Sequence, residues 1–230
     1  MNFSCLLCYQ ASPTPVCQWC EHDLFIFTCP QYKENLLEFG PISRHVRHSA
    51  YHKLCLLGLY APPLSTLIQA MKFRHSLVSA SEIARLFVAK MQQHESPLPT
   101  LLLPVPISPL RMARRHYNQA AVLASKVSAL TGIPLCNSWA QRKGASTQHR
   151  LSKQARIQNA RRSFSLTAIC LDSMLEKPDI HLHVAIVDDV ITTGVSADVL
   201  AALLKKRYPE IYIEVWAMAF TPPPKSTLLN

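Results

Sequence analysis

Residues 184–197, VAIVDDVITTGVSA, combine chemical groups that could bind a phosphorylated sugar. An apolar run is followed by two adjacent acids, then by Thr, Gly and Ser ahead of a predicted helix. In an open α/β sheet, ligands bind where strands end and helices begin, and the free amides of a helix N-terminus suit a phosphate. Gly194 lets the backbone approach a ligand closely, and the hydroxyls of Thr192, Thr193 and Ser196 can donate hydrogen bonds to it.

The two acids, Asp188 and Asp189, need a partner other than the phosphate. Carboxylates accept hydrogen bonds from sugar hydroxyls, and they also bind a divalent metal that a ligand can carry. A ligand that combines a phosphate with a free diol is a ribose 5-phosphate. The alternative is a strand, turn and helix with a capped start and no ligand at all.

The N-terminus carries two cysteine pairs with the spacing of a zinc site. CLLC at 5–8 and CQWC at 17–20 place four thiols in two knuckles, and these thiols are Cys5, Cys8, Cys17 and Cys20. Four thiolates complete a tetrahedral zinc site without another ligand, which is typical of a structural site. The alternative is four free thiols or two disulfides. We expect a cytoplasmic protein with reduced thiols, because the first residues do not form a signal peptide.

Positive charge is concentrated in one third of the chain. The net charge is +10, and no Asp or Glu occurs between Ser96 and Leu171, whereas eleven Lys and Arg do. Such a segment typically faces phosphates, either of a small ligand or of a nucleic-acid backbone, and the alternative is a solvated basic face. The candidates for DNA binding are Arg142, Lys143, Arg150, Lys153, Arg156, Arg161 and Arg162.

The order of predicted elements indicates an α/β protein with a mostly parallel sheet covered on both faces. The apolar runs are too short for a transmembrane helix. Residues 33–60 form a connector to which we assign no element. Strands are predicted at 101–105, 181–187 and 211–218. Helices are predicted at 64–74, 110–130, 152–162 and 197–207, and one more helix is predicted to begin at an N-cap at Ser81.

VAIVDDVITTG resembles the phosphoribosyl pyrophosphate (PRPP) loop of type I phosphoribosyltransferases. The resemblance implies that Asp188 and Asp189 bind the ribose hydroxyls. It implies that the 5-phosphate is bound by Thr192, Thr193, Gly194, Val195 and Ser196. Many members have Gly in place of Val195, and a β-branched residue tolerates a positive φ poorly, so we expect a slightly altered loop. The pyrophosphate of PRPP requires cations, and Mg²⁺ would accompany it.

A second segment, LLLPVPISPLRMARRHYNQA at 101–120, could supply these cations. Its arginines follow a strand end, and they are candidates for the pyrophosphate side, namely Arg111, Arg114 and Arg115. The alternative is a basic amphipathic helix.

A four-cysteine knuckle ahead of such a domain is similar to the ComF family. YAPPLSTLIQAMKF resembles a family segment that ends in Leu-Lys-Phe, and it adds Lys72 to the pyrophosphate side. Residues 105–124 and 147–164 resemble two further family segments, although His116 replaces the usual Gly. The resemblance implies a zinc module and connector at 1–58 and a type I phosphoribosyltransferase-like domain at 59–230.

The family implies a role in natural transformation, in which single-stranded DNA enters the cytoplasm near competence proteins of the inner membrane. The first hypothesis is a PRPP-binding accessory factor that handles this DNA, cytoplasmic or at the periphery of the inner membrane. The second is an active phosphoribosyltransferase that transfers ribose 5-phosphate to a base or another acceptor. The third is a zinc protein that retains the loop as a structural relic.

Overall fold

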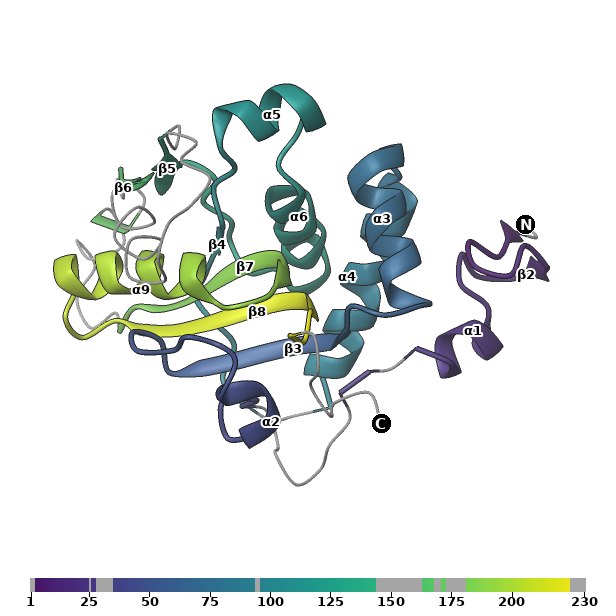
Figure 1. The fold of residues 1–230 in the computed structure, drawn as a ribbon, viewed down its shortest axis with the longest axis horizontal. Helices are drawn as coiled ribbons and strands as arrows, with labels where there is room; N and C mark the ends of the chain where they lie inside the picture. The colour runs from purple at the N-terminus through teal and green to yellow at the C-terminus, as the bar shows by residue number, and fades with distance from the viewer. Residues whose placement is uncertain are drawn as a thin grey trace.

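The computed structural model describes residues 3–24, 26–27, 35–93, 96–143, 163–167, 171–172 and 181–223. Within these ranges a four-stranded parallel sheet with the order β3-β8-β7-β4 forms the centre of the molecule (Figure 1). Its strands are β3 (Lys53–Leu59), β4 (Leu101–Pro104), β7 (His183–Ile191) and β8 (Tyr212–Phe220). The expected parallel sheet is therefore confirmed.

Helices cover both faces of the sheet, as the near-continuous apolar strands predict. One face packs against α3 (Leu64–Arg74), α4 (Leu77–Met91) and α6 (Gln119–Thr131). The other face packs against α9 (Val195–Arg207) and the connector around α2 (Gly40–Ser43). Alternate residues of each strand enter the two cores; in β7, Val184 and Ile186 face α9, while Ala185 and Val187 face α6.

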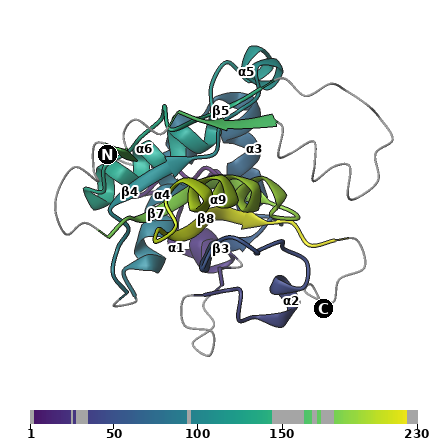
Figure 2. The ribbon, with the colours of Figure 1, turned by 90° about the vertical axis from the view of Figure 1, so that its left-hand side faces the viewer.

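Two small sheets and two short helices complete the described structure. An antiparallel pair, β1 (Phe3–Ser4) and β2 (Ala11–Ser12), precedes α1 (Gln18–His22) in the N-terminal module, which lies beside α3 and α4 in Figure 1. A second antiparallel pair joins β5 (Ala140–Arg142) and β6 (Phe164–Leu166). Both views place β5 at the same end of the molecule as α5 (Pro109–Arg115) (Figure 2). None of the helices in the described ranges is long and apolar enough to cross a bilayer.

The connector contains a strand that the sequence analysis missed. KLCLLGL forms β3, in which all seven residues are buried, and it pairs in parallel with β8. The expected division after residue 58 falls inside this strand, so the connector contributes to the sheet of the second domain. Its sequence contains a Lys and a Gly and lacks the β-branched and aromatic residues that favour a strand.

Two helix predictions are wrong in detail, and the expected helix at 152–162 lies outside the described residues. The predicted helix 110–130 is two helices, because His116 adopts a left-handed conformation (φ 62°) and Asn118 caps α6 by accepting a hydrogen bond from the Ala120 amide. The helix predicted to start at Ser81 begins earlier, at a cap formed by Ser76. A left-handed His75 ends α3 directly before that cap, so the two helices are separated by two residues only.

Candidate functional site: a polar pocket at the strand ends

The two acids lie inside β7 rather than after it. The predicted strand ended at Val187, but β7 continues to Ile191 because β8 pairs with it as far as Phe220. On the other side, β4 stops at Pro104, opposite Val187. From Asp188 onward, β7 therefore has a sheet neighbour on one side only, which leaves room for a pocket on the other side.

The carboxylates have different environments in this pocket. Asp189 Oδ2 lies 2.9 Å from Lys72 Nζ, and both side chains are largely buried. Burial, and then the charge of Asp189, raise the pKa of Asp188 to about 8, although Lys72 acts in the opposite direction. Folding therefore favours the protonated form of Asp188.

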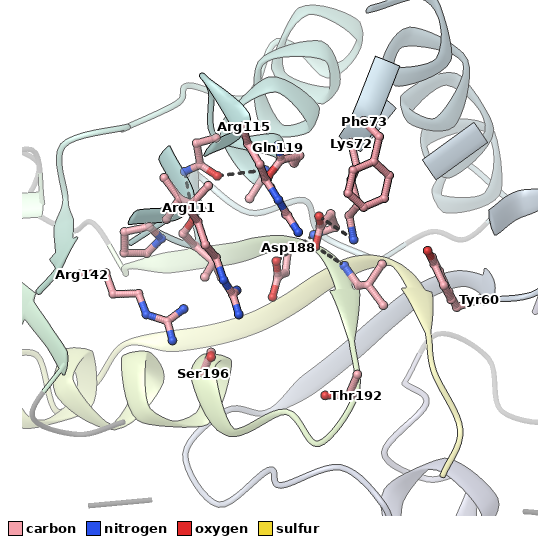
Figure 3. Close-up of a pocket in the computed structure, with 17 residues that line it drawn as sticks. Tyr60, Lys72, Phe73, Arg111, Arg115, Gln119, Arg142, Asp188, Thr192 and Ser196 are labelled. Carbon is pink, nitrogen blue, oxygen red and sulfur yellow. Dashed lines mark hydrogen bonds and ion pairs between the residues drawn. The ribbon is translucent and has the colours of Figure 1, made fainter. Parts of the chain in front are cut away.

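The pocket has a volume of about 500 Å³ and is rich in cations (Figure 3). Arg111 and Arg115 come from α5, Arg142 comes from β5, and Lys72 comes from α3. Arg115 Nη1 donates to Gln119 Oε1 at 3.1 Å. The lining also includes Asp188, Asp189, Thr192 and Ser196 from the end of β7 and the start of α9.

Arg142 is the cation of this pocket that the sequence analysis assigned elsewhere. Its guanidinium carbon lies 5.0 Å from the centre of the Phe164 ring, and its Nε is buried without a hydrogen-bond partner in the described structure. Burial, and then the charge of Arg111, lower the pKa of Arg142, so a second cation of the pocket adds to the effect of burial. An anionic ligand would relieve this repulsion.

Comparison with known proteins shows which family this chain belongs to. Competence protein F of Haemophilus influenzae is 34% identical over 215 residues, which cover 91% of this chain and 86% of that protein. The DNA utilization protein YhgH of Escherichia coli K12 is 31% identical over 176 residues, which cover 74% and 73% of the two chains. The chain belongs to the competence protein F (ComF) family.

Two further comparisons add no conclusion about this ComF-family chain. No family model matches the sequence. The solved adenine phosphoribosyltransferase of Leishmania tarentolae overlaps with 73% of this chain and 91% of its own, at 13% identity. Its TM-score of 0.33 is too low to support an inference.

The structure brings together most, but not all, of the residues that the sequence analysis assigned to the pocket. Of the predicted pyrophosphate side, Lys72, Arg111 and Arg115 line the pocket, whereas Arg114 is exposed and does not. Of the predicted DNA-binding residues, Arg142 lines the pocket and Lys143 is exposed. The others lie outside the described residues, namely Arg150, Lys153, Arg156, Arg161 and Arg162.

The phosphate loop itself does not have the alteration that we expected at Val195. The left-handed residue is Gly194, with φ 68°, and Val195 is the first residue of α9. Gly194 occupies the N-cap position, and no side chain caps this helix. The first amides of α9 thus lack a side-chain acceptor, which is the condition under which a helix start can bind a phosphate.

The four N-terminal cysteines of this ComF-family chain form one cluster. Their sulfur atoms lie within 4.8 Å of one another, and Cys8 Sγ is 3.7 Å from Cys17 Sγ. Zn–S bonds of about 2.3 Å in a tetrahedron separate the sulfurs by roughly 3.8 Å, so the cluster fits a structural zinc ion. The four cysteines are free thiols in this structure, and no disulfide joins them.

Backbone amides prepare the cysteine cluster for a cation. Cys17 N donates to Cys5 Sγ at 3.4 Å, and Cys20 N donates to Cys17 Sγ at 3.5 Å. Burial alone would raise the pKa of Cys5, but the amides around it outweigh burial and lower that pKa to about 6, whereas burial and then the neighbouring thiols raise the pKa of Cys20. The module is tied to the domain by an ion pair in which Glu21 Oε2 lies 2.5 Å from Arg85 Nη2 on α4.

Sequence reasoning missed two other contributions to the site. The ring of Tyr60 lies under Lys72, with the ammonium 5.7 Å from the ring centre, and exposed Phe73 forms part of the pocket edge. The connector segment 46–50 packs behind the phosphate loop, where Arg47 N donates to Thr193 O at 2.8 Å. No local pattern marks these residues, because their role depends on contacts between distant parts of the chain.

Proposed function

We propose that the pocket binds PRPP or a related ribose 5-phosphate ligand, and that the protein serves DNA uptake by handling incoming single-stranded DNA on the cytoplasmic side. The proposed ligand rests on the convergence of two acids, two aliphatic hydroxyls and four cations on one pocket. Carboxylates suit a ribose diol, and the cations suit phosphates. A single anion would need fewer cations, and a neutral sugar would need none.

The arrangement suits a ligand with negative charge at both ends. Thr192, Ser196 and the start of α9 lie at one part of the pocket, where we place the 5-phosphate. Arg111 and Arg115 lie on α5, where we place the pyrophosphate. Asp188 and Asp189 lie between them on β7 and would bind the ribose, with Mg²⁺ entering as part of the ligand.

The DNA part of the proposal rests on the relatives and on the charge distribution. The two relatives described above are named for competence and for DNA utilization. The acid-free segment from Ser96 to Leu171 suits binding to a nucleic-acid backbone irrespective of sequence. We further propose that the protein meets competence proteins at the inner membrane, where DNA enters.

An active phosphoribosyltransferase is the second candidate, and one observation favours it. Tyr60 and Phe73 place two aromatic rings at the pocket, beside the acid pair. A planar acceptor base could stack there while the bond between ribose C1 and the pyrophosphate breaks and a bond from C1 to the acceptor forms. The arginines would then stabilise the charge on the leaving pyrophosphate.

Two assays test these proposals on the full-length protein. The melting temperature is measured with PRPP and Mg²⁺, with ribose 5-phosphate and with ribose. We expect stabilisation by the two phosphorylated ligands and none by ribose, and stabilisation by neither would refute the ligand assignment. Pyrophosphate release is then measured with a panel of bases and with single-stranded DNA. Release in any mixture supports transfer, and binding of PRPP without release in all of them supports the accessory role.

A further inference from the structure

Asp198 is a buried acid in the first turn of α9, directly after the phosphate loop. The residue is 2% exposed, yet its carboxylate is fully engaged by the connector. Arg47 Nε lies 2.5 Å from Asp198 Oδ2, Ser49 Oγ donates to both oxygens at 3.0 and 2.9 Å, and Ala50 N donates to Oδ1 at 2.9 Å. A buried carboxylate is costly unless it is paired, so these contacts fix segment 46–50 against α9.

The same segment also contacts the phosphate loop itself. Arg47 N donates to Thr193 O at 2.8 Å, which holds the peptide group just before Gly194. A Cβ atom on Gly194 would lie 2.6 Å from Val46 Cγ1 and 2.8 Å from Arg47 O. The connector therefore occupies the space that a side chain on residue 194 would need. It packs directly against Gly194, the N-cap residue of α9.

Arg47 has an electrostatic role in addition to this steric one. An unpaired carboxylate in the first turn of α9 would repel a phosphate bound at the start of the same helix. The Arg47 guanidinium neutralises that carboxylate at 2.5 Å, so the positive end of the helix stays available to a ligand anion. Because Arg47 neutralises it, Asp198 can fix the loop to the connector without repelling a bound phosphate.

We propose that Asp198 and Arg47 are positioning residues that hold Thr193–Ser196 in the phosphate-binding conformation, so that connector segment 46–50 belongs to the site. The identity of the ligand rests on the proposed function above. The conformational part does not, because its contacts join residues of this chain only. Neither residue lines the pocket, and neither needs to touch the ligand.

Calorimetric titrations test the ligand part of this inference. Ribose 5-phosphate probes the loop, and pyrophosphate with Mg²⁺ probes the arginine side. We expect Arg47→Ala to weaken ribose 5-phosphate roughly 10- to 100-fold and pyrophosphate by less than about 2-fold. The matched control is Arg44→Ala, since Arg44 is exposed on the same connector and bonds only Gly40 O within the described structure. Equal losses for both ligands, or unchanged ribose 5-phosphate binding, would overturn the positioning role.

Hydrogen exchange tests the conformational part without any ligand. We expect Arg47→Ala, but not Arg44→Ala, to increase exchange of the amides between residues 193 and 198. The double variant Arg47→Ala, Asp198→Asn should recover part of the ribose 5-phosphate affinity, because it removes the unpaired charge. Unchanged exchange would overturn the inference. Increased exchange in a protein that binds neither ligand would support positioning and would refute the proposed function instead.

Discussion

Replacing Asp188 by Asn measures how strongly the folded protein opposes a negative charge on that residue. Burial, and then the charge of Asp189, raise the pKa of Asp188 from 3.8 to about 8. A raised carboxyl pKa means that the folded protein holds this proton more tightly than the unfolded chain does. The stability that this group contributes is therefore complete below about pH 4, and it is lost as the pH rises to about 8. The D188N variant has no such proton to lose.

The magnitude follows from the size of the pKa shift. About four units correspond to ~6 kcal/mol at most, at 1.36 kcal/mol for each unit. Asp188 is only partly buried, so solvent screens its charge, and we expect a gain of ~2 kcal/mol for D188N over the wild type at pH 9. The gain should shrink steadily toward pH 5, because the wild type recovers its proton over that range.

Urea unfolding of the wild type and D188N at pH 5, 7 and 9 gives this difference directly. Asp172→Asn provides a control of opposite sign, because hydrogen bonds from Tyr208 and then Arg207 lower the pKa of Asp172. That variant should lose stability at neutral pH and regain it relative to the wild type in acid. A D188N variant that is less stable than the wild type at pH 9, or that shows the same difference at pH 5 and pH 9, would refute the reasoning.

Three further predictions concern the loop, the zinc module and DNA. Gly194→Ala should lower the free energy of unfolding in urea by ~2–4 kcal/mol, because the added Cβ clashes with the connector and residue 194 has a φ of 68°. Gly132→Ala is the control: its φ is 76°, but the space around its Cβ is open, so it should lower the free energy of unfolding by only ~1 kcal/mol. Equal losses in the two variants would contradict the contact between Gly194 and the connector. Cys17→Ser should reduce the bound zinc below one ion per chain and lower the melting temperature. A chelator should lower the melting temperature of the wild type but not of the variant. Full zinc content in the variant would contradict the four-thiolate site. Arg161→Ala with Arg162→Ala should weaken binding to single-stranded DNA and reduce its salt slope by ~1 for each DNA phosphate that the variant no longer neutralises, and an unchanged slope would exclude a DNA surface there.

The sequence was sufficient to predict what short segments encode. The apolar strands at β4, β7 and β8, the amphipathic α3 and the cysteine knuckles each carry their signal within about ten residues. The loop from Asp188 to Ser196 was found because a strand, two acids and a Gly-containing turn occur in one continuous stretch. The structure then placed five of its residues around one pocket.

The features that the sequence did not reveal depend on pairing between distant segments. β3 lies beside β8, and it was missed because KLCLLGL contains a Gly and lacks the β-branched and aromatic residues that favour a strand. Charge alone could not distinguish Arg142, which points into the pocket, from Lys143, which is exposed. The pairing of Arg47 with Asp198 spans 151 residues, and no spacing rule relates them.

Titration of PRPP with Mg²⁺ into the full-length protein tests the ribose-phosphate pocket most directly. The comparison uses the wild type, the double variant Asp188→Ala, Asp189→Ala, and Asp23→Ala as a control in an exposed acid of the N-terminal module. We predict saturable binding with one site per chain for the wild type and the control, and an affinity at least ~100-fold weaker for the double variant. Binding that is equal in all three proteins, or absent from the wild type, would contradict the assignment of this pocket to a ribose-phosphate ligand.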